Sequence, residues 1–206
     1  MSFFSEIASK PWTDEQIKVD DQFKGHTFTL PKAMLGLRVL LVVVTMFFTL
    51  LAIAYSGRMT FEDWQSLPEP GLLWFNTGLL LVSSVVFRWT KSATQQGRNG
   101  KVKLGLFLVG ALAFAFLIGQ LIVWQQLADL GHFASANPAN GFFYLITGLH
   151  GLHLLGGLVA WGRTTLRVMR GKIGQEKLLL SVEMCALYWS FLLVVWLAMF
   201  LLLLVT

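Results

Sequence analysis

The sequence has little charge and almost no cysteine, and both shortages limit what the chain can be. Only 13% of its 206 residues are charged, whereas 55% are hydrophobic, and the mean hydropathy is +0.65. This composition is too apolar for a soluble globular domain. The single cysteine, Cys185, excludes an internal disulfide and a cysteine-based metal site, so we expect it to be a small buried hydrophobe. The composition therefore predicts an integral membrane protein.

The start of the chain also lacks an apolar run of signal-peptide length. Lys and acidic residues are mixed over Met1–Pro31. We therefore expect no cleaved targeting segment, a cytoplasmic N-terminal tail over residues 1–33, and insertion directed by the first spanning helix.

Continuous apolar runs predict an all-α bundle of five transmembrane helices over residues 34–206. At about 1.5 Å per residue, these runs are of the length that crosses a hydrocarbon core of about 30 Å. The runs do not alternate between apolar and polar residues, which argues against a barrel. The expected helices cover residues 34–55, 72–89, 104–127, 142–161 and 179–205, approximately.

Lys and Arg are unevenly distributed among the tail and the connections. The tail, the second connection and the fourth connection each carry several, whereas the first carries Arg58 and the third carries none. The positive-inside rule then predicts a cytoplasmic N-terminus and an external C-terminus. The connections are short, so we expect no extramembrane domain for a nucleotide or a soluble cofactor, and no nucleic-acid partner.

Ionisable side chains within the predicted spans are His150, His153 and Glu183. A charge at the bilayer centre costs at least about 2.5 kcal/mol, so each should face protein, bound lipid or water. With Thr147, the histidines make a polar face on the fourth span. We expect Thr147, His150, His153 and Glu183 to form a polar seam that serves structure or lipid binding. For Glu183, proton uptake, pairing with a histidine and a position at the helix end stay open.

The spans do not predict a metal or haem site. Two histidines three residues apart can share an ion, but a di-iron bundle needs Glu-x-x-His on two helices and further glutamates. Haem held between helices needs a second span with histidine, and His26 and His132 lie in the tail and a loop. We expect no catalytic, cofactor-binding or metal-binding residue in the chain.

Small residues on the fourth span predict close helix packing. Gly148, Gly151 and Gly157 allow backbones to approach, as small residues do at helix contacts in lipid. Polar residues of the second span can supply hydrogen bonds to that contact; they are Asn76, Thr77, Ser83 and Ser84. The tryptophans of the spans are expected to include anchors at the membrane interface.

The spans resemble subunit III of the haem-copper terminal oxidases, cytochrome c and quinol oxidases alike. The match is densest at Thr147-Gly148-Leu149-His150-Gly151-Leu152-His153, which is similar to the family's Thr-Gly-x-His-Gly-x-His motif. Further matches lie in family order along the chain, at Met46-Phe47-Phe48, Asn76-Thr77, Gln120 and Tyr188-Trp189. Five helices correspond to the short bacterial form, which lacks the first two helices of the seven-helix type.

The chain departs from the family pattern at several polar positions. Val44-Thr45 stands where many members have a glutamate before Met-Phe-Phe, and Val123 stands where the third helix commonly has one. Ser190 and Leu193 replace a histidine and an aspartate of the last helix. These losses remove candidate proton-handling and subunit-contact groups. They indicate a divergent member, with the accessory subunit found beside nitric oxide reductases as an alternative.

The resemblance implies an accessory role in the bacterial inner membrane. Subunit III holds no haem or copper, packs on catalytic subunit I in a complex that also contains subunit II, and binds phospholipid. It supports proton uptake, oxygen access and stability of an enzyme that reduces oxygen to water while pumping protons. Membership of a respiratory supercomplex and the electron donor, cytochrome c or quinol, stay open.

Two other functions stay open as alternatives to the accessory role. A small transporter or proton channel would use His150, His153 and Glu183, although they do not make a polar file across the membrane. An electron-transfer subunit with its own haem would show itself in an absorption spectrum.

Overall fold

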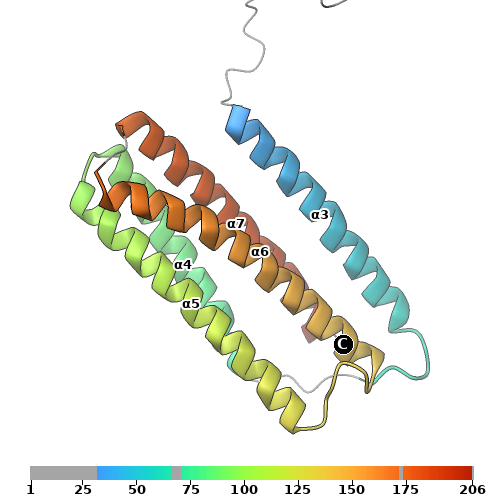
Figure 1. Cartoon of the computed structure of the whole chain (residues 1–206). Coiled ribbons are helices and arrows are strands. Elements are labelled where there is room, and N and C mark those ends of the chain that lie inside the picture. The colour runs from blue at the N-terminus through green and yellow to red at the C-terminus, as the bar shows by residue number, and fades with distance from the viewer. Residues whose placement is uncertain (1–31, 66–70, 172–173, 206) are drawn as a thin grey trace, which may run out of the picture. The chain divides into compact units, whose positions relative to one another are not determined.

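The computed structural model describes residues 32–65, 71–171 and 174–205, which are almost entirely helical (Figure 1). The helices are α3 (Lys32–Arg58), α4 (Leu72–Gln95), α5 (Asn99–Asp129), α6 (Pro138–Met169) and α7 (Gln175–Leu204). All five are long and apolar enough to cross a membrane, and the described residues contain no strand. The predicted all-α class and its five spanning helices are therefore confirmed.

The chain divides into two compact units, Met1–Gly36 and Leu37–Thr206. Of the first unit, the structure describes only the opening residues of α3. The predicted tail, residues 1–33, otherwise lies outside the described residues, so its cytoplasmic position stays a prediction. The orientation of the two termini also stays a prediction.

Within the second unit, α4 to α7 form a closed four-helix bundle. Helix α4 packs against α5 and α7, and α6 packs against the same two helices (Figure 1). The core of this bundle is rich in aromatic rings, with Phe87, Phe116, Phe143, Trp189 and Trp196 among its fully buried side chains. Burial of such large rings provides extensive contact between helices.

Helix α3 meets α6 and α7 through a second cluster of apolar side chains. Val44, Phe48 and Tyr55 of α3 pack with Ile146 of α6 and Met199 of α7. Most of the remaining apolar side chains of α3 are exposed. Only 11% of its spanning window is buried, so this helix presents most of its apolar surface outward.

The helices extend beyond the predicted apolar runs. Helix α4 continues to Gln95 and α6 to Met169, although the apolar runs end near Trp89 and Trp161. Hydropathy marks the part of a helix that suits hydrocarbon, whereas turn and cap residues determine where the helix ends. The added turns are polar and carry many of the cations.

Capping residues account for the ends of these longer helices. Asn137 Oδ1 accepts a hydrogen bond from Ala139 N at 3.1 Å, and Pro138 occupies the first turn of α6. Gly97 and Gly131 follow α4 and α5 with φ of 67° and 83°. This left-handed conformation is one that glycine adopts without steric cost, so each helix stops there.

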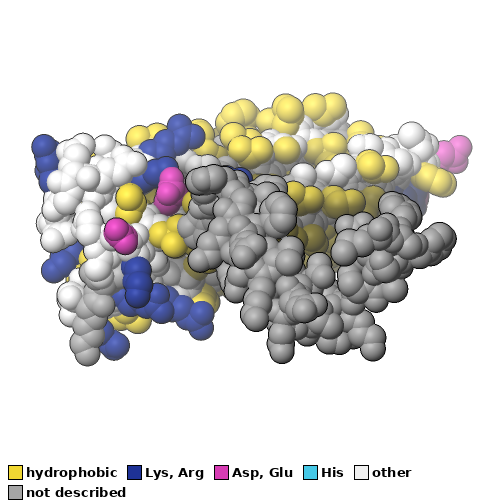
Figure 2. Space-filling model, turned by 90° about the horizontal axis from the view of Figure 1, so that it is seen from above, with side chains coloured by type: hydrophobic (Ala, Val, Ile, Leu, Met, Phe, Trp, Pro, Cys, Tyr) yellow, Lys and Arg dark blue, Asp and Glu magenta, His cyan; other side chains and the backbone are white. Residues whose placement is uncertain are grey.

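Lys and Arg gather where α4 joins α5 and where α6 joins α7, at one end of the bundle. Arg98, Lys101, Arg167, Arg170 and Lys177 belong to this group. Figure 2 shows most of the visible Lys and Arg side chains toward one end, with hydrophobic side chains over much of the rest. Such an asymmetry is the basis of the predicted orientation.

Candidate functional site

Two tryptophans of α7 donate hydrogen bonds to α4 in the buried interior. Trp189 Nε1 lies 2.9 Å from Ser83 Oγ, and Trp196 Nε1 lies 2.9 Å from Thr77 Oγ1. The donors are two turns apart on α7, and the acceptors follow in reverse order on antiparallel α4. Ser83 and Thr77 thus accept from α7 and not from the glycine-rich span, although the Trp189 ring that donates to Ser83 lies beside Gly157 of that span.

Two further indoles connect α5 and α6. Trp161 Nε1 of α6 donates to Leu106 O at 2.9 Å, and Trp124 Nε1 of α5 donates to Thr147 Oγ1 at 3.1 Å. The Thr147 hydroxyl in turn donates to Phe143 O at 2.7 Å, so it is both donor and acceptor. These two tryptophans make contacts within the bundle, and the expectation that some tryptophans are interfacial anchors stays a prediction.

His150 lies at the centre of the bundle with 1% of its surface exposed. Its ring centroid is 5.1 Å from that of Trp196 and 6.0 Å from that of Phe116. Those two rings meet edge to face at 5.1 Å. Neither ring nitrogen of His150 has a hydrogen-bond partner among the described residues.

His153 faces different neighbours from His150. Its Nδ1 lies 2.7 Å from Leu149 O, and since a carbonyl only accepts, this nitrogen carries the proton. Its ring centroid lies 5.4 Å from that of Phe48 on α3. The Tyr188 hydroxyl donates to His153 O at 2.9 Å. The two imidazoles therefore have no common set of neighbours that would make them joint ligands.

Glu183 pairs with a lysine of α4. Lys91 Nζ lies 2.7 Å from Glu183 Oε1, and their side chains are 34% and 38% exposed. Thr164 Oγ1 lies 3.8 Å from Cys185 Sγ, which aligns this part of α7 with α6 about three turns beyond His153. The observed partner of Glu183 is a lysine, and not a histidine, which was one of the possibilities left open by the sequence.

The four residues predicted as one seam do not all share the same surroundings. Thr147 and His150 both face α5, whereas His153 meets α3 and Glu183 pairs with α4. The structure does not bring all four together. A structural or lipid-binding role for each stays a prediction.

An amide pair that sequence reasoning did not join lies in the same interior. Asn76 Nδ2 of α4 donates to Gln120 Oε1 of α5 at 3.4 Å, and both side chains are buried. Asn76 lies directly against Gly119, where an added Cβ would come within 2.2 Å of Asn76 Oδ1. The sequence did carry a signal for this pair, because amide side chains inside apolar spans are costly unless they are paired.

The predicted packing glycines differ in what they touch. A Cβ on Gly157 would meet Tyr188 Cε1 at 2.8 Å, which is a close approach, and one on Gly148 would meet Trp124 at 3.4 Å. A Cβ on Gly151 would find nothing within 4 Å. Gly151 therefore sets no close approach in the described part of the chain, because its α-carbon faces open space.

The tightest glycine contacts belong to α5, which sequence reasoning did not single out. A Cβ would come within 2.1 Å of Thr90 at Gly105, and within 2.2 Å of Trp161 at Gly110. Each glycine leaves room for a larger side chain of the neighbouring helix. Composition alone does not tell which glycine faces a partner, so the sequence offered no clear signal for these two.

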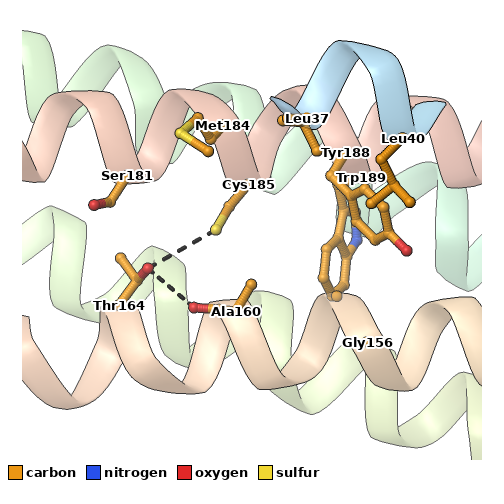
Figure 3. A pocket seen from close by; sticks show the side chains of 11 residues that line it. Leu37, Leu40, Gly156, Ala160, Thr164, Ser181, Met184, Cys185, Tyr188 and Trp189 are labelled. Atoms are coloured by element: carbon orange, nitrogen blue, oxygen red, sulfur yellow. Dashed lines mark hydrogen bonds between the residues drawn. The ribbon is translucent and has the colours of Figure 1, made fainter. Parts of the chain in front are cut away.

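A cavity of about 330 Å³ lies between α3, α6 and α7 (Figure 3). Leu40, Ala160, Thr164, Cys185 and Tyr188 are among the residues that line it. Thr164 and Cys185 face each other in Figure 3, and the threonine hydroxyl donates to Ala160 O at 3.0 Å. The walls are mainly apolar, which suits a hydrocarbon chain. Cys185 is buried in the core, which confirms the prediction of a small buried hydrophobe.

The first prediction compares two glycines of α6. Gly157→Ala should lower the free energy of unfolding by about 1–3 kcal/mol relative to Gly151→Ala, because only the first places a methyl group against Tyr188. Both changes bring the same gain in helix propensity, so their difference isolates the packing effect. The measurement is thermal unfolding of the detergent-solubilised protein. Equal stability of the two variants would contradict the close approach.

The second prediction concerns the Lys91–Glu183 pair. Lys91→Glu and Glu183→Lys should each destabilise by up to about 1 kcal/mol, since the pair is only partly shielded from solvent. The double exchange restores an opposite-charge pair, so it should recover most of that loss. The same unfolding assay, at low and at high salt, measures the stability of the three variants. A double variant no more stable than the singles would show that the pairing does not matter.

Comparison with known proteins identifies the family. The model of the family described as cytochrome c oxidase subunit III matches residues 1–205. The chain is 29% identical to cytochrome c oxidase subunit 3 of Anopheles gambiae over 203 residues, 92% of this chain and 75% of that one. It is 29% identical to the Synechocystis sp. protein of the same name over 183 residues, 86% and 77% of the two chains.

A mycobacterial relative matches over a shorter stretch. The chain is 27% identical to the probable cytochrome c oxidase subunit 3 of Mycobacterium tuberculosis over 124 residues, which is 60% of this chain and 61% of the relative. These matches and the five apolar helices define a multi-pass integral membrane protein. The resemblance seen in the sequence is thereby confirmed: the chain belongs to the cytochrome c oxidase subunit III family.

Proposed function

We propose that this chain is an accessory, non-catalytic subunit of a respiratory haem-copper oxidase that reduces oxygen to water with proton pumping. The observation that carries the proposal is the family match over residues 1–205. The interior contacts support it, because the polar side chains of the spans hold helices to one another. Trp189–Ser83, Trp196–Thr77 and Trp124–Thr147 are bonds of this kind.

The ionisable residues of the spans are engaged separately and do not form a site of their own. His150 and His153 face different neighbours, and Glu183 pairs with Lys91. Subunit III of these oxidases carries no metal centre. Among the described residues, no group of three or more His, Cys, Asp or Glu side chains is placed to hold a metal ion. In this proposal, haem and copper belong to partner subunits.

The proposed partners are catalytic subunit I, subunit II of the same complex, and phospholipid. The chain would pack on subunit I in the bacterial inner membrane, support its proton uptake and stabilise it. The apolar cavity between α3, α6 and α7 supports lipid binding, because it can hold part of an acyl chain. Arg163 and Arg167 lie farther along α6, where cations favour anionic headgroups.

The alternatives receive less support. A transporter or proton channel needs polar groups that follow one path. Thr147 and His150 both face α5, but His153 meets α3 and Glu183 pairs with α4. The relatives named above are cytochrome c oxidase subunits, so an accessory subunit of a nitric oxide reductase is not favoured.

The third prediction tests the accessory role. Affinity purification of the tagged chain from gently solubilised membranes should recover a larger haem- and copper-containing partner with oxidase activity. The isolated chain should show neither haem absorbance nor oxygen consumption, since its own residues supply no redox site. An unrelated tagged membrane protein from the same cells controls for non-specific recovery. Recovery of the tagged chain alone under conditions that keep the oxidase intact would overturn the proposal.

A further inference from the structure

The centre of the α4–α7 bundle contains polar atoms without partners. Both ring nitrogens of His150, Asn76 Oδ1 and Gln120 Nε2 are buried and have no hydrogen-bond partner among the described residues. Buried polar groups in proteins are nearly always hydrogen-bonded, to protein or to bound water. In a membrane the requirement is stricter, because hydrocarbon offers no alternative partner.

These atoms come from side chains that face the same part of the interior. On α5, Gln120 lies one turn from Phe116 and one turn from Trp124. Phe116 contacts His150, whereas Trp124 bonds to Thr147. Gln120 therefore faces α6 between Thr147 and His150. Its Oε1 also accepts from Asn76, so the amide pair joins α4 to this part of α5.

The unpaired donors and acceptors match those of water. A neutral imidazole has one donor and one acceptor, the Gln120 nitrogen is a donor, and the Asn76 oxygen is an acceptor. A water molecule offers two donors and two acceptors, and buried water usually makes about three hydrogen bonds. If the oxygen and nitrogen positions of both amides are exchanged, the pair still forms one hydrogen bond and still leaves one donor and one acceptor unpaired. The match to water therefore does not depend on how the amide atoms are assigned.

The surroundings favour water over a charged ligand. The aromatic rings of Phe116 and Trp196 lie against His150, and Gly119 lies against Asn76. None of these neighbours carries a charge that would balance an ion. A mainly apolar groove of about 350 Å³ lies beside Gln120 and is also lined by Thr147 and Gly151. The open space at Gly151 belongs to this groove.

We propose that the bundle holds internal water between His150 and the Asn76–Gln120 pair. This water completes the hydrogen bonding of the imidazole and the amides, and it links α4, α5 and α6 at one level. His150 then remains neutral and fully hydrogen-bonded in the bundle centre, without an ionic partner. The inference concerns the chain itself and does not depend on the identity of the associated subunits.

A density map of the purified full-length protein, with the subunits that accompany it, tests the site directly. The map should show a peak about 2.7–3.2 Å from a ring nitrogen of His150 and from the Gln120 amide nitrogen. The peak should be absent in Gln120→Leu. An empty site would overturn the proposal if the same map shows buried waters elsewhere at equal local resolution. A direct His150–Gln120 hydrogen bond would also overturn it.

Stability provides a fourth prediction and an independent test of the same water. Gln120→Leu and His150→Phe should each lower the thermal midpoint, because each strands the polar group that remains. The sum of the two single-variant decreases in midpoint should exceed the decrease of the double variant, since both changes remove hydrogen bonds to the same water. Gln126→Leu, at an exposed amide of α5, is the matched control and should leave the midpoint unchanged. Additive effects of the two buried changes would contradict the proposal.

Discussion

A polar group placed in hydrocarbon needs a partner inside the protein, and the α4–α7 bundle is arranged by that requirement. The clearest expression is the pair of α7 indoles that donate to α4, Trp189 to Ser83 and Trp196 to Thr77, each at 2.9 Å. An indole N–H only donates and a hydroxyl can accept, so each bond defines which residues of the two helices lie opposite one another. The large ring then fills the surrounding space, which joins hydrogen bonding to packing.

Small residues lie opposite the large rings, because a large ring needs space on the neighbouring helix. Gly110 lies under the Trp161 ring, whose indole nitrogen donates to Leu106 O one turn away. Gly157 likewise lies under Tyr188. Helix α3 makes a different kind of contact, in which Phe48 and other apolar side chains meet α6 and α7. The polar interior is thus concentrated in α4 to α7, and a mainly apolar cavity lies beside α3.

Much of this fold could be predicted, and the part that could not has a physical reason. Long apolar runs determined the five spans, although α6 begins at Pro138 and so before the predicted residue 142. The double-histidine motif identified the family. Partners across helices were not predictable, because Ser83 can serve any adjacent helix and only the packing selects Trp189. Helix ends were also missed, since hydropathy does not report turns such as that at Gly97.

The interior of this chain therefore uses polar residues to hold its helices in register. A double-mutant cycle on Trp189→Phe and Ser83→Ala, read as thermal unfolding of the solubilised protein, tests this claim most directly. A hydrogen bond between membrane helices contributes about 0.6 kcal/mol on average, so the account predicts a stabilising coupling of that order. Thr49→Ala, at an exposed hydroxyl that bonds within its own helix, is the control. Strictly additive losses would contradict the account.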